Sequence, residues 1–384
     1  MLPEHPSSRF TRRLLEVLFM PVPRQGNPYQ HQLASGLSRH GVRVRMARGY
    51  MQPFPFLQAS IRRPRPSVFH LHWTQPYLYW PRTGRMSRLL GWRLLIQVRL
   101  LRRLGIRIVW TVHNMAAHER DDIGPELSVS RRLAGLCDAL IVHCEAARQL
   151  VIETLAIPVE RQASVVVVPH GNYINAYPQT SSRDEARRGF GFSDADRVLL
   201  LFGALRAYKG TTDLLDAFAA VDRPDVRLLI AGKPFTPELA EEIGRLAARD
   251  PRVVTHLQFV PDEDIQHYLG AADAAVAPFR DVLTSGTVVL AMSLGLAVIA
   301  PRLGCLPDTV DQAGGILYDP GAPDALPAAV RQALSADLRA MGAHNRARVE
   351  PLTWAYVADQ TLRRAYVGRD DGARAPDRPA AGHL

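Results

Sequence analysis

Lysine is nearly absent from this chain of 384 residues, since Lys209 and Lys233 are the only two among 47 basic side chains. No segment is predicted to span a membrane, because polar or charged residues interrupt the long apolar stretches. The N-terminal run LLEVLFMPV contains Glu16 and is followed by no small-residue cleavage site, so it predicts a first strand and not a secretory signal. We therefore expect a soluble or peripheral protein.

Cysteine is also scarce. Cys137, Cys144 and Cys305 occur at spacings that match no metal-binding motif. Because an odd number of cysteines gives no disulfide framework, we expect three buried, small apolar side chains and a reducing cytoplasm.

Acidic residues are missing from a long part of the first half. No aspartate or glutamate lies between Glu16 and Glu119, where sixteen arginines occur, and the net charge of the chain is +10. Charge of one sign over such a stretch predicts an anionic partner, namely phospholipid, a lipid-linked diphosphate or nucleic acid. Codon usage could explain the excess of arginine over lysine, but it does not explain the missing carboxylates.

Residues 85–105 predict an amphipathic helix within this acid-free stretch. We expect one apolar stripe to pack on the core, formed by Leu90, Leu94, Val98 and Leu101. Other apolar side chains should project among the arginines of the opposite face, namely Leu89, Trp92, Leu95 and Ile96. This mixture suits a membrane interface. Packing on a neighbouring element or partner is the alternative.

Short apolar runs alternate with helical patterns along the whole chain, which predicts an α/β protein with parallel sheets covered by helices on both faces. The runs form two sets, so we expect two doubly wound, Rossmann-like domains. The predicted division is an N-terminal domain over residues 1–178, a second domain over 179–350, a C-terminal helix over 351–368 and a disordered tail over 369–384.

Two stretches of the second half predict a site for a diphosphate. In FGALRAYKG, Gly203 ends a strand, and Arg206 and Lys209 precede a helix that Thr211 or Thr212 could cap. In the stretch from residue 277 to 301, polar residues open an apolar helix after another strand, namely Thr284, Ser285, Gly286 and Thr287. Arg280 could add charge there, and Asp281 could bind a sugar hydroxyl. A solvated turn is the alternative for the first stretch.

Polar and aromatic residues also follow the predicted strands of the first half. They are His72 and Trp73, His113 and Asn114, and His170 and Gly171. Ligands of open parallel sheets bind beyond the carboxyl ends of the strands, so we expect these residues to line the cleft between the domains.

The motif F-G-x-L-R-x-Y-K-G, followed by S-G-T-hhh-A-x-S-x-G-hhhhAP, resembles the nucleotide-binding domain of GT-B glycosyltransferases. In the first half, GNPYQHQLASGL, VFHLHW, TVHNMAAHE and VVPHG resemble the bacterial xanthan-type GDP-mannose β-mannosyltransferases. The resemblance covers nearly the whole chain. It implies a nucleotide-sugar donor held by the second domain, with His170 and Gly171 beside it, because a glycine lets the backbone approach the donor. It also implies an acceptor site and a C-terminal helix that Trp354 anchors on the first domain. The acceptor residues are Asn27, Tyr29, His72, Trp73 and Asn114.

Retaining members of this fold commonly carry two glutamates, and the corresponding positions here are Val282 and Leu290. The resemblance therefore implies an inverting mechanism, which requires a base for the acceptor hydroxyl. The stretch TVHNMAAHE offers His113, His118 and Glu119, of which Glu119 and His113 are the leading candidates.

No metal or other cofactor is expected. Two D-x-D-like triplets, at residues 194–196 and 262–264, lie in polar loops and do not predict a metal site.

The sequence thus predicts a glycosyltransferase that moves a sugar, with mannose from GDP-mannose as the best assignment, onto a polyprenyl-diphosphate-linked or other glycolipid acceptor for exopolysaccharide or glycolipid synthesis. Its expected place is the cytoplasm, peripheral at the inner face of the plasma membrane, without nucleic acid. The alternatives are a retaining transferase with another UDP or GDP sugar, a sugar-nucleotide epimerase or hydrolase, and a non-catalytic binder of anionic polymer. The oligomeric state stays open.

Overall fold

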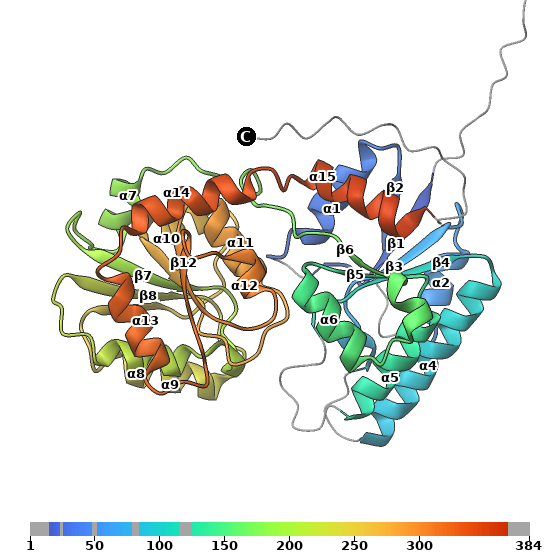
Figure 1. Ribbon diagram of the computed structural model, residues 1–384, viewed down its shortest axis with the longest axis horizontal. Coiled ribbons are helices and arrows are strands. Elements are labelled where there is room, and N and C mark those ends of the chain that lie inside the picture. Colours follow the sequence, from blue (N-terminus) through green and yellow to red (C-terminus); the bar gives the residue numbers. More distant parts are fainter. Residues whose placement is uncertain (1–14, 24–25, 48–51, 79–83, 115–123, 368–384) are drawn as a thin grey trace, which may run out of the picture.

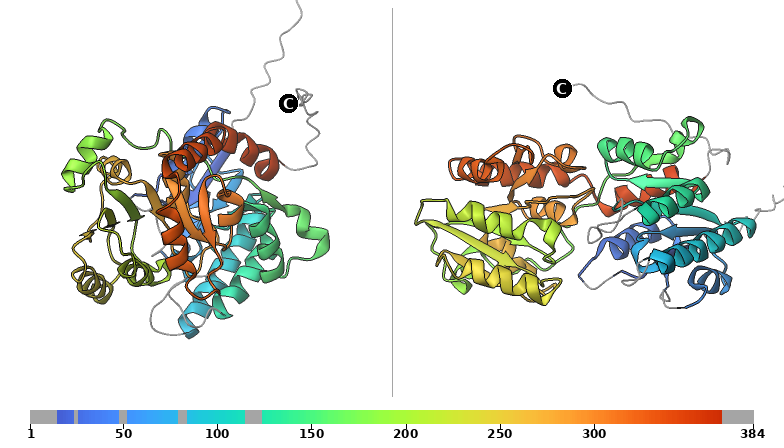
Figure 2. Two further views of the ribbon diagram at one scale, coloured as in Figure 1. Left: turned by 60° about the vertical axis from the view of Figure 1, so that its left-hand side comes forward. Right: turned by 90° about the horizontal axis from the view of Figure 1, so that it is seen from below.

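The computed structural model describes residues 15–23, 26–47, 52–78, 84–114 and 124–367. These residues form two α/β lobes, each built on one parallel sheet (Figure 1). Two further views show the same pair of lobes side by side (Figure 2).

The first lobe contains the following elements in chain order: β1 (Glu16–Met20), α1 (Tyr29–Ser38), β2 (Arg43–Met46), α2 (Pro55–Ile61), β3 (Val68–Leu71), α3 (Gln75–Leu78), α4 (Gly84–Arg103), β4 (Arg107–Thr111), α5 (Gly124–Leu136), β5 (Ala139–Val142), α6 (Glu145–Thr154), η1 (Val159–Ser164) and β6 (Val165–Val167).

The second lobe contains α7 (Arg183–Gly189), β7 (Arg197–Phe202), η2 (Ala207–Lys209), α8 (Thr211–Ala219), β8 (Val226–Ala231), α9 (Pro237–Ala247), β9 (Val253–His256), α10 (Ile265–Ala271), β10 (Ala274–Val276), α11 (Gly286–Ser293), β11 (Ala297–Pro301), α12 (Leu306–Thr309), β12 (Gly315–Tyr318), α13 (Ala325–Ala333) and α14 (Leu338–Val349). The chain then forms α15 (Trp354–Thr361) and a short π-helix, η3 (Leu362–Tyr366).

Each sheet has six strands, and every pair of neighbouring strands is parallel. The orders are β2-β1-β3-β4-β5-β6 and β12-β11-β10-β7-β8-β9. The central strands are apolar without alternation, as in β7, where Val198 to Leu201 are all buried. A strand of this kind needs helices on both faces of its sheet, which explains why the chain alternates strand and helix. The predicted doubly wound α/β fold is confirmed.

The helix α15 crosses from the second lobe back onto the first, as predicted. It lies beside α1, whereas α13 and α14 stay with the second sheet (Figure 1). The indole Nε1–H of Trp354 donates to the carbonyl of Asn172 at 2.7 Å. A β-carbon on Gly36 would collide with the carbonyl of Trp354, so a glycine in α1 allows this close approach. Trp354 therefore anchors the crossing helix on the first lobe.

Helix α4 differs from the prediction at one position. Of the predicted core stripe, Leu94, Val98 and Leu101 are buried and Leu90 is half-buried. On the opposite face, Leu89, Trp92 and Ile96 are 63%, 56% and 42% exposed. Leu95, however, is buried, because α5 packs along that side of α4. No helix in the described ranges is long and apolar enough to cross a membrane.

The start of α8 also differs from the expectation. Neither Thr211 nor Thr212 caps this helix, because its N-cap is Gly210. Gly210 has a φ of 68°, and the carbonyl of Pro278 lies where its β-carbon would be. The turn before α8 is therefore packed directly against the chain that follows β10.

Candidate active site

The predicted donor residues converge at the carboxyl ends of β7 and β10. Gly203 follows β7 with a φ of 100°. A β-carbon on Gly203 would lie 3.3 Å from Oγ1 of Thr287 and 3.4 Å from Nζ of Lys209. The structure therefore brings Gly203, Lys209 and Thr287 together, although they come from three separate segments. A glycine at this point leaves room for a ligand to reach the ammonium and the hydroxyl.

Lys209 lies at the end of η2, where its side chain is half-buried. Burial, with a smaller contribution from the positive charge of Arg206, lowers the pKa of Lys209 to about 8. An ammonium group in such a place favours an anion beside it, because an opposite charge restores the stability of the protonated form.

Helix α11 presents its N-terminus to the same place. The hydroxyl of Ser285 accepts a hydrogen bond from the amide of Val288 at 3.3 Å and so caps the helix. The first amides of a helix have no intrahelical acceptor, so those of Gly286 and Thr287 face the space before α11. Together with Lys209 they are the donors that an anionic phosphate would use.

Arg206 stands beside this cluster, on an aromatic side chain that the sequence analysis did not select. Its guanidinium carbon lies 4.4 Å from the centre of the Phe235 ring. Phe235 follows β8 and is 55% exposed. The only signal for it in the sequence is its position shortly after a strand.

Arg280 and Asp281, two predicted donor residues, lie in the segment that follows β10. Arg280 forms a bidentate ion pair with Asp213, with nitrogen to oxygen distances of 2.8 and 2.6 Å. This pair neutralises the charge that we expected Arg280 to offer the donor. Asp281 and Arg280 are exposed, and Thr284 is half-buried.

The first lobe faces this site with a row of histidines. His72 follows β3, His113 lies shortly after β4, His143 follows β5, and His170 lies shortly after β6. The Tyr29 ring, at the start of α1, contacts all four, with centroid distances from 4.8 to 5.8 Å. The sequence analysis did not select His143, although it follows the carboxyl end of a strand as the other three histidines do.

His113 occupies the middle of this histidine row. Its ring stacks on Trp73 at a centroid distance of 4.6 Å, and its Nε2 lies 3.4 Å from Nδ1 of His72. Burial, followed by the positive charges that His143 and His170 would carry, lowers the pKa of His113 well below its ordinary value. The imidazole is therefore neutral at neutral pH, and it would hold a proton only with a negative charge beside it.

His170 connects the histidine row with the donor side. Its Nδ1–H donates to the carbonyl of Gly171 at 2.8 Å, and a β-carbon on Gly286 would lie 3.7 Å from its Nε2. Gly171 itself packs against Trp354, since a β-carbon there would lie 2.6 Å from the indole ring. The lack of a side chain at Gly171 thus lets the indole ring of the crossing helix pack closely here, and its role in donor binding stays a prediction.

The remaining predicted residues are divided between described and undescribed parts of the chain. Asn27 accepts a hydrogen bond from the amide of Tyr29 at 3.1 Å, which fixes the start of α1, and Tyr29 is buried. Asn114 is half-buried. His118 and Glu119 lie outside the described residues, so their roles stay predictions.

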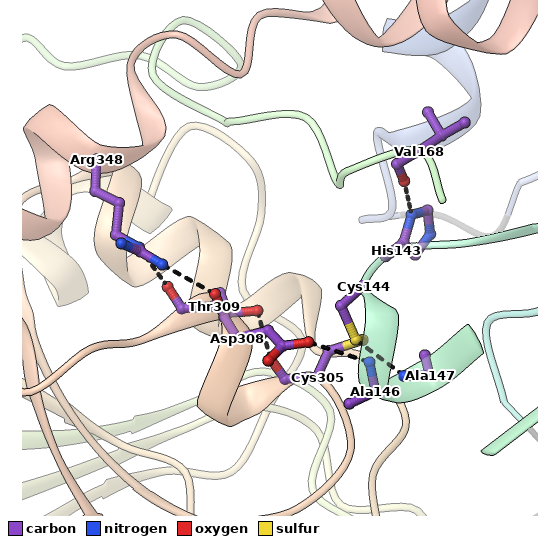
Figure 3. The surroundings of a disulfide bond; sticks show 9 residues. All are labelled: His143, Cys144, Ala146, Ala147, Val168, Cys305, Asp308, Thr309 and Arg348. Atoms are coloured by element: carbon purple, nitrogen blue, oxygen red, sulfur yellow. Dashed lines mark hydrogen bonds between the residues drawn. A yellow bond between two sulfur atoms is a disulfide. The ribbon is translucent and has the colours of Figure 1, made fainter. Parts of the chain in front are cut away.

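The expectation that the chain has no disulfide is wrong. Cys144 and Cys305 form one, with 5.8 Å between their α-carbons (Figure 3). Only Cys137 is a free, buried thiol as predicted, and burial raises its pKa. The described residues contain no group of three or more His, Cys, Asp or Glu side chains that could hold a metal ion.

Comparison with known proteins identifies the class. Residues 196–336 match the family described as Glycosyl transferases group 1. The sucrose-phosphate synthase of Thermosynechococcus elongatus has the same fold, with a TM-score of 0.72 over 91% of this chain and 98% of that one at 20% identity. The Anabaena protein HepE, in complex with UDP and glucose, gives a TM-score of 0.67 over the same shares of the two chains at 18% identity. The two lobes therefore form a GT-B glycosyltransferase fold.

Two relatives extend the match into the first lobe. The GDP-mannose:glycolipid 4-beta-D-mannosyltransferase of Xanthomonas campestris pv. campestris is 29% identical over 276 residues, which are 72% of this chain and 70% of the relative. The D-inositol 3-phosphate glycosyltransferase of Segniliparus rotundus is 28% identical over 336 residues, which are 83% of this chain and 70% of the relative. The match to the family Glycosyl transferases group 1 thus lies in the second lobe.

Proposed function

We propose that this protein transfers mannose from GDP-mannose, with inversion, to a lipid-linked oligosaccharide at the cytoplasmic face of the membrane. The observation that carries the proposal is the meeting of Lys209, Thr287 and Gly203 at the strand ends, opposite a row of histidines. Mannose and the glycolipid are supported by the name of the Xanthomonas campestris relative.

The donor side of the site would hold the diphosphate of the nucleotide sugar. Lys209 supplies a positive charge, and α11 supplies amides at its positive end. When the bond between the sugar C1 and the phosphate oxygen breaks, negative charge grows on the departing diphosphate. Fixed donors stabilise that charge without reorganisation, which lowers the barrier of the transfer.

Inversion is supported by two buried apolar residues. Val282 and Leu290, the positions at which retaining members of the fold carry glutamates, are 8% and 6% exposed. Neither can hydrogen-bond a sugar. In the proposed reaction the acceptor oxygen attacks C1 from the face opposite the diphosphate, so the new bond forms as the old one breaks.

The acceptor proton needs a base on the first lobe. His113 is neutral at neutral pH and stands in the histidine row, and a bound diphosphate would raise its low pKa through its negative charge. Glu119 remains the other candidate. The reaction requires only one base, and the two residues are alternatives for that role.

A lipid-linked acceptor is supported by helix α4. Leu89, Trp92 and Ile96 are exposed on it together with Arg88 and Arg99. Indole and aliphatic side chains enter the headgroup region of a bilayer, and arginines bind anionic lipids. We therefore propose that this face of α4 brings the first lobe to the membrane that holds the acceptor.

An epimerase or hydrolase of the same fold is the alternative, and one assay separates the candidates. The protein is incubated with GDP-mannose, UDP-glucose or UDP-galactose, with and without a polyprenyl-diphosphate-linked oligosaccharide, and the product anomer is assigned by NMR. We expect acceptor-dependent release of GDP and a β-mannoside. One of the two substitutions His113→Ala and Glu119→Gln should abolish transfer and so identify the base, whereas His31→Ala, at an exposed position of α1, serves as the control.

Three outcomes would contradict the proposal. Release of the nucleotide without any need for acceptor indicates a hydrolase, and an altered sugar on the nucleotide indicates an epimerase. An α-linked product would overturn inversion while leaving the transferase assignment in place.

A further inference from the structure

The disulfide joins the two domains. Cys144 lies between β5 and α6 of the first lobe, and Cys305 directly precedes α12 of the second, 161 residues further along the chain. Figure 1 shows the polypeptide linker and α15 connecting the lobes at the top, with α6 and α12 facing each other below them. The bridge is therefore a further covalent connection, separate from the two crossings that the polypeptide makes.

A hydrogen bond accompanies the bridge across the same boundary. The amide of Ala146, in the first turn of α6, donates to a carboxylate oxygen of Asp308 in α12 at 3.2 Å. Arg348 donates to the carbonyl of Asp308 at 3.0 Å and so fixes α12 to the end of α14 (Figure 3). The segment that carries Cys305 is thus held firmly within the second lobe.

The bridge is also close to both halves of the proposed site. On the first lobe, Cys144 follows His143, whose ring lies 5.6 Å from that of His113 between centroids. On the second lobe, the amide of Cys305 donates to the carbonyl of Leu283 at 2.8 Å, directly before the turn that opens α11. One covalent bond therefore connects the histidine row to the segment that faces the diphosphate.

We propose that the Cys144–Cys305 bridge is a reversible clamp that limits the opening of the cleft between the two lobes. The proposal rests on the proposed function, because it assigns the clamp a place in the binding and release of a nucleotide sugar. A hinge at the linker would let α6 and α12 separate, and the bridge prevents this separation while it is intact. The oxidised protein keeps the two half-sites together but exchanges ligands slowly.

Reduction follows ordinary thiol–disulfide exchange. Both sulfurs are buried, with Cys144 and Cys305 only 7% and 2% exposed, so a dithiol reductant reaches the bridge when the contact between α6 and α12 loosens locally. Its thiolate attacks the sulfur of Cys305, and the sulfur of Cys144 leaves as a thiolate, which gives a mixed disulfide. The second thiol of the reductant then displaces Cys305, so the protein gains two thiols and the reductant becomes a disulfide. Cys144 is the better leaving group, because its sulfur caps α6 and accepts a hydrogen bond from the amide of Ala147 at 3.2 Å.

Turnover should depend on whether the bridge is oxidised or reduced. Opening of the domains or release of the product limits the rate of many enzymes that close around a substrate. We expect the steady-state rate of the reduced enzyme to exceed that of the oxidised enzyme. The rate of a single turnover, started with the donor already bound, should be the same in both states.

The test compares the protein treated with a dithiol reductant and with oxidised glutathione. Thiol titration after denaturation should find one thiol in the oxidised protein, Cys137, and all three cysteines after reduction. Hydrogen exchange read by mass spectrometry should become faster on reduction in peptides that contain Ala146 and Leu283. Cys144→Ser keeps a hydrogen-bond acceptor at the start of α6 and should behave as the reduced protein in both treatments, whereas Cys137→Ala should still respond to them.

The outcomes separate the clamp from the proposed function. Faster hydrogen exchange on reduction supports the clamp even if no sugar is transferred. In that case the proposed function alone fails. Equal hydrogen exchange and equal turnover in the two redox states would overturn the clamp and leave the proposed transferase function in place. Three titratable thiols after oxidation would overturn it as well.

Discussion

The guanidinium of Arg206 stacks on the ring of Phe235, and this contact joins the turn after β7 to the turn after β8. Two backbone hydrogen bonds hold the turns together, from the amide of Leu205 to the carbonyl of Lys233 and from the amide of Phe235 to the carbonyl of Leu205, both at 2.9 Å. The ring therefore has a fixed position from which it orients Arg206 beside the donor site.

Replacement of Phe235 should weaken donor binding. A cation–π contact at an exposed site contributes about 0.5–1 kcal/mol, so Phe235→Ala should raise the KM for the donor about two- to fivefold. Phe235→Tyr keeps an aromatic face and should behave as the wild type. Steady-state kinetics with varied donor measures the effect, and an unchanged KM in the alanine variant would show that the ring does not position Arg206.

Lys209→Ala should remove most of the activity without unfolding the protein. Loss of one preorganised donor to a developing charge raises the barrier by about 3 kcal/mol, on the order of a hundredfold in kcat. Lys233→Ala, which removes the other lysine of the chain at an exposed position, is the matched control. Turnover at the wild-type rate in the Lys209 variant would refute its assignment to the departing diphosphate.

The pH dependence of donor capture should reveal the lysine directly. Burial lowers the pKa of Lys209 to about 8, so the free enzyme loses the ammonium charge as the pH rises through about 8. We expect kcat/KM for the donor to be level below that pH and to fall above it. Arginine stays charged over this range. Lys209→Arg should therefore abolish the fall, and Lys233→Arg should retain it.

One rule located much of the candidate site from the sequence, namely that functional residues of parallel sheets follow the carboxyl ends of the strands. It selected Gly203, Lys209 and Thr287, which lie together in the structure, and three of the four histidines in the row. It works because all strands of a parallel sheet end at the same edge, so neighbours in space need not be neighbours in sequence. The rule gives no information about which exposed side chain supports a catalytic one, and Phe235 was missed for that reason.

Contacts between separate elements were harder to predict. Leu95 was assigned to the exposed face of α4, but α5 packs on that side, and a helix pattern alone does not show how many neighbours the helix has. Cys144 and Cys305 lie in different domains, so their pairing depends on how the domains meet. An odd number of cysteines carried no information about that arrangement.

Helix α4 should bind anionic membranes through its exposed apolar side chains. Full burial of a large apolar side chain contributes about 1.5–3 kcal/mol, so Trp92→Ser should reduce binding to phosphatidylglycerol vesicles by roughly tenfold or more. Co-sedimentation measures the bound fraction. Leu150→Ser, at a position of α6 that is 40% exposed, should leave binding unchanged. Equal binding of the Trp92 variant and the wild type would remove α4 from the membrane contact.

The buried histidines should make the protein sensitive to acid. Burial lowers the pKa of His143 to about 4, whereas the unfolded chain binds the proton near pH 6.5. Between these values the unfolded state holds more protons, so stability is constant above about pH 6.5 and is lost as the pH falls toward about 4.

His143→Asn should reduce this loss, because an asparagine amide can still donate to the carbonyl of Val168, the partner of Nδ1 at 2.9 Å, but does not titrate. The difference in unfolding free energy between pH 7.5 and pH 5 should shrink by roughly 2 kcal/mol, measured by urea denaturation. His31→Asn, at an exposed position, should leave that difference as it is in the wild type. An unchanged pH dependence in the His143 variant would mean that this histidine is already protonated in the folded protein at pH 5, and that the histidine row is less shielded from water than its burial indicates.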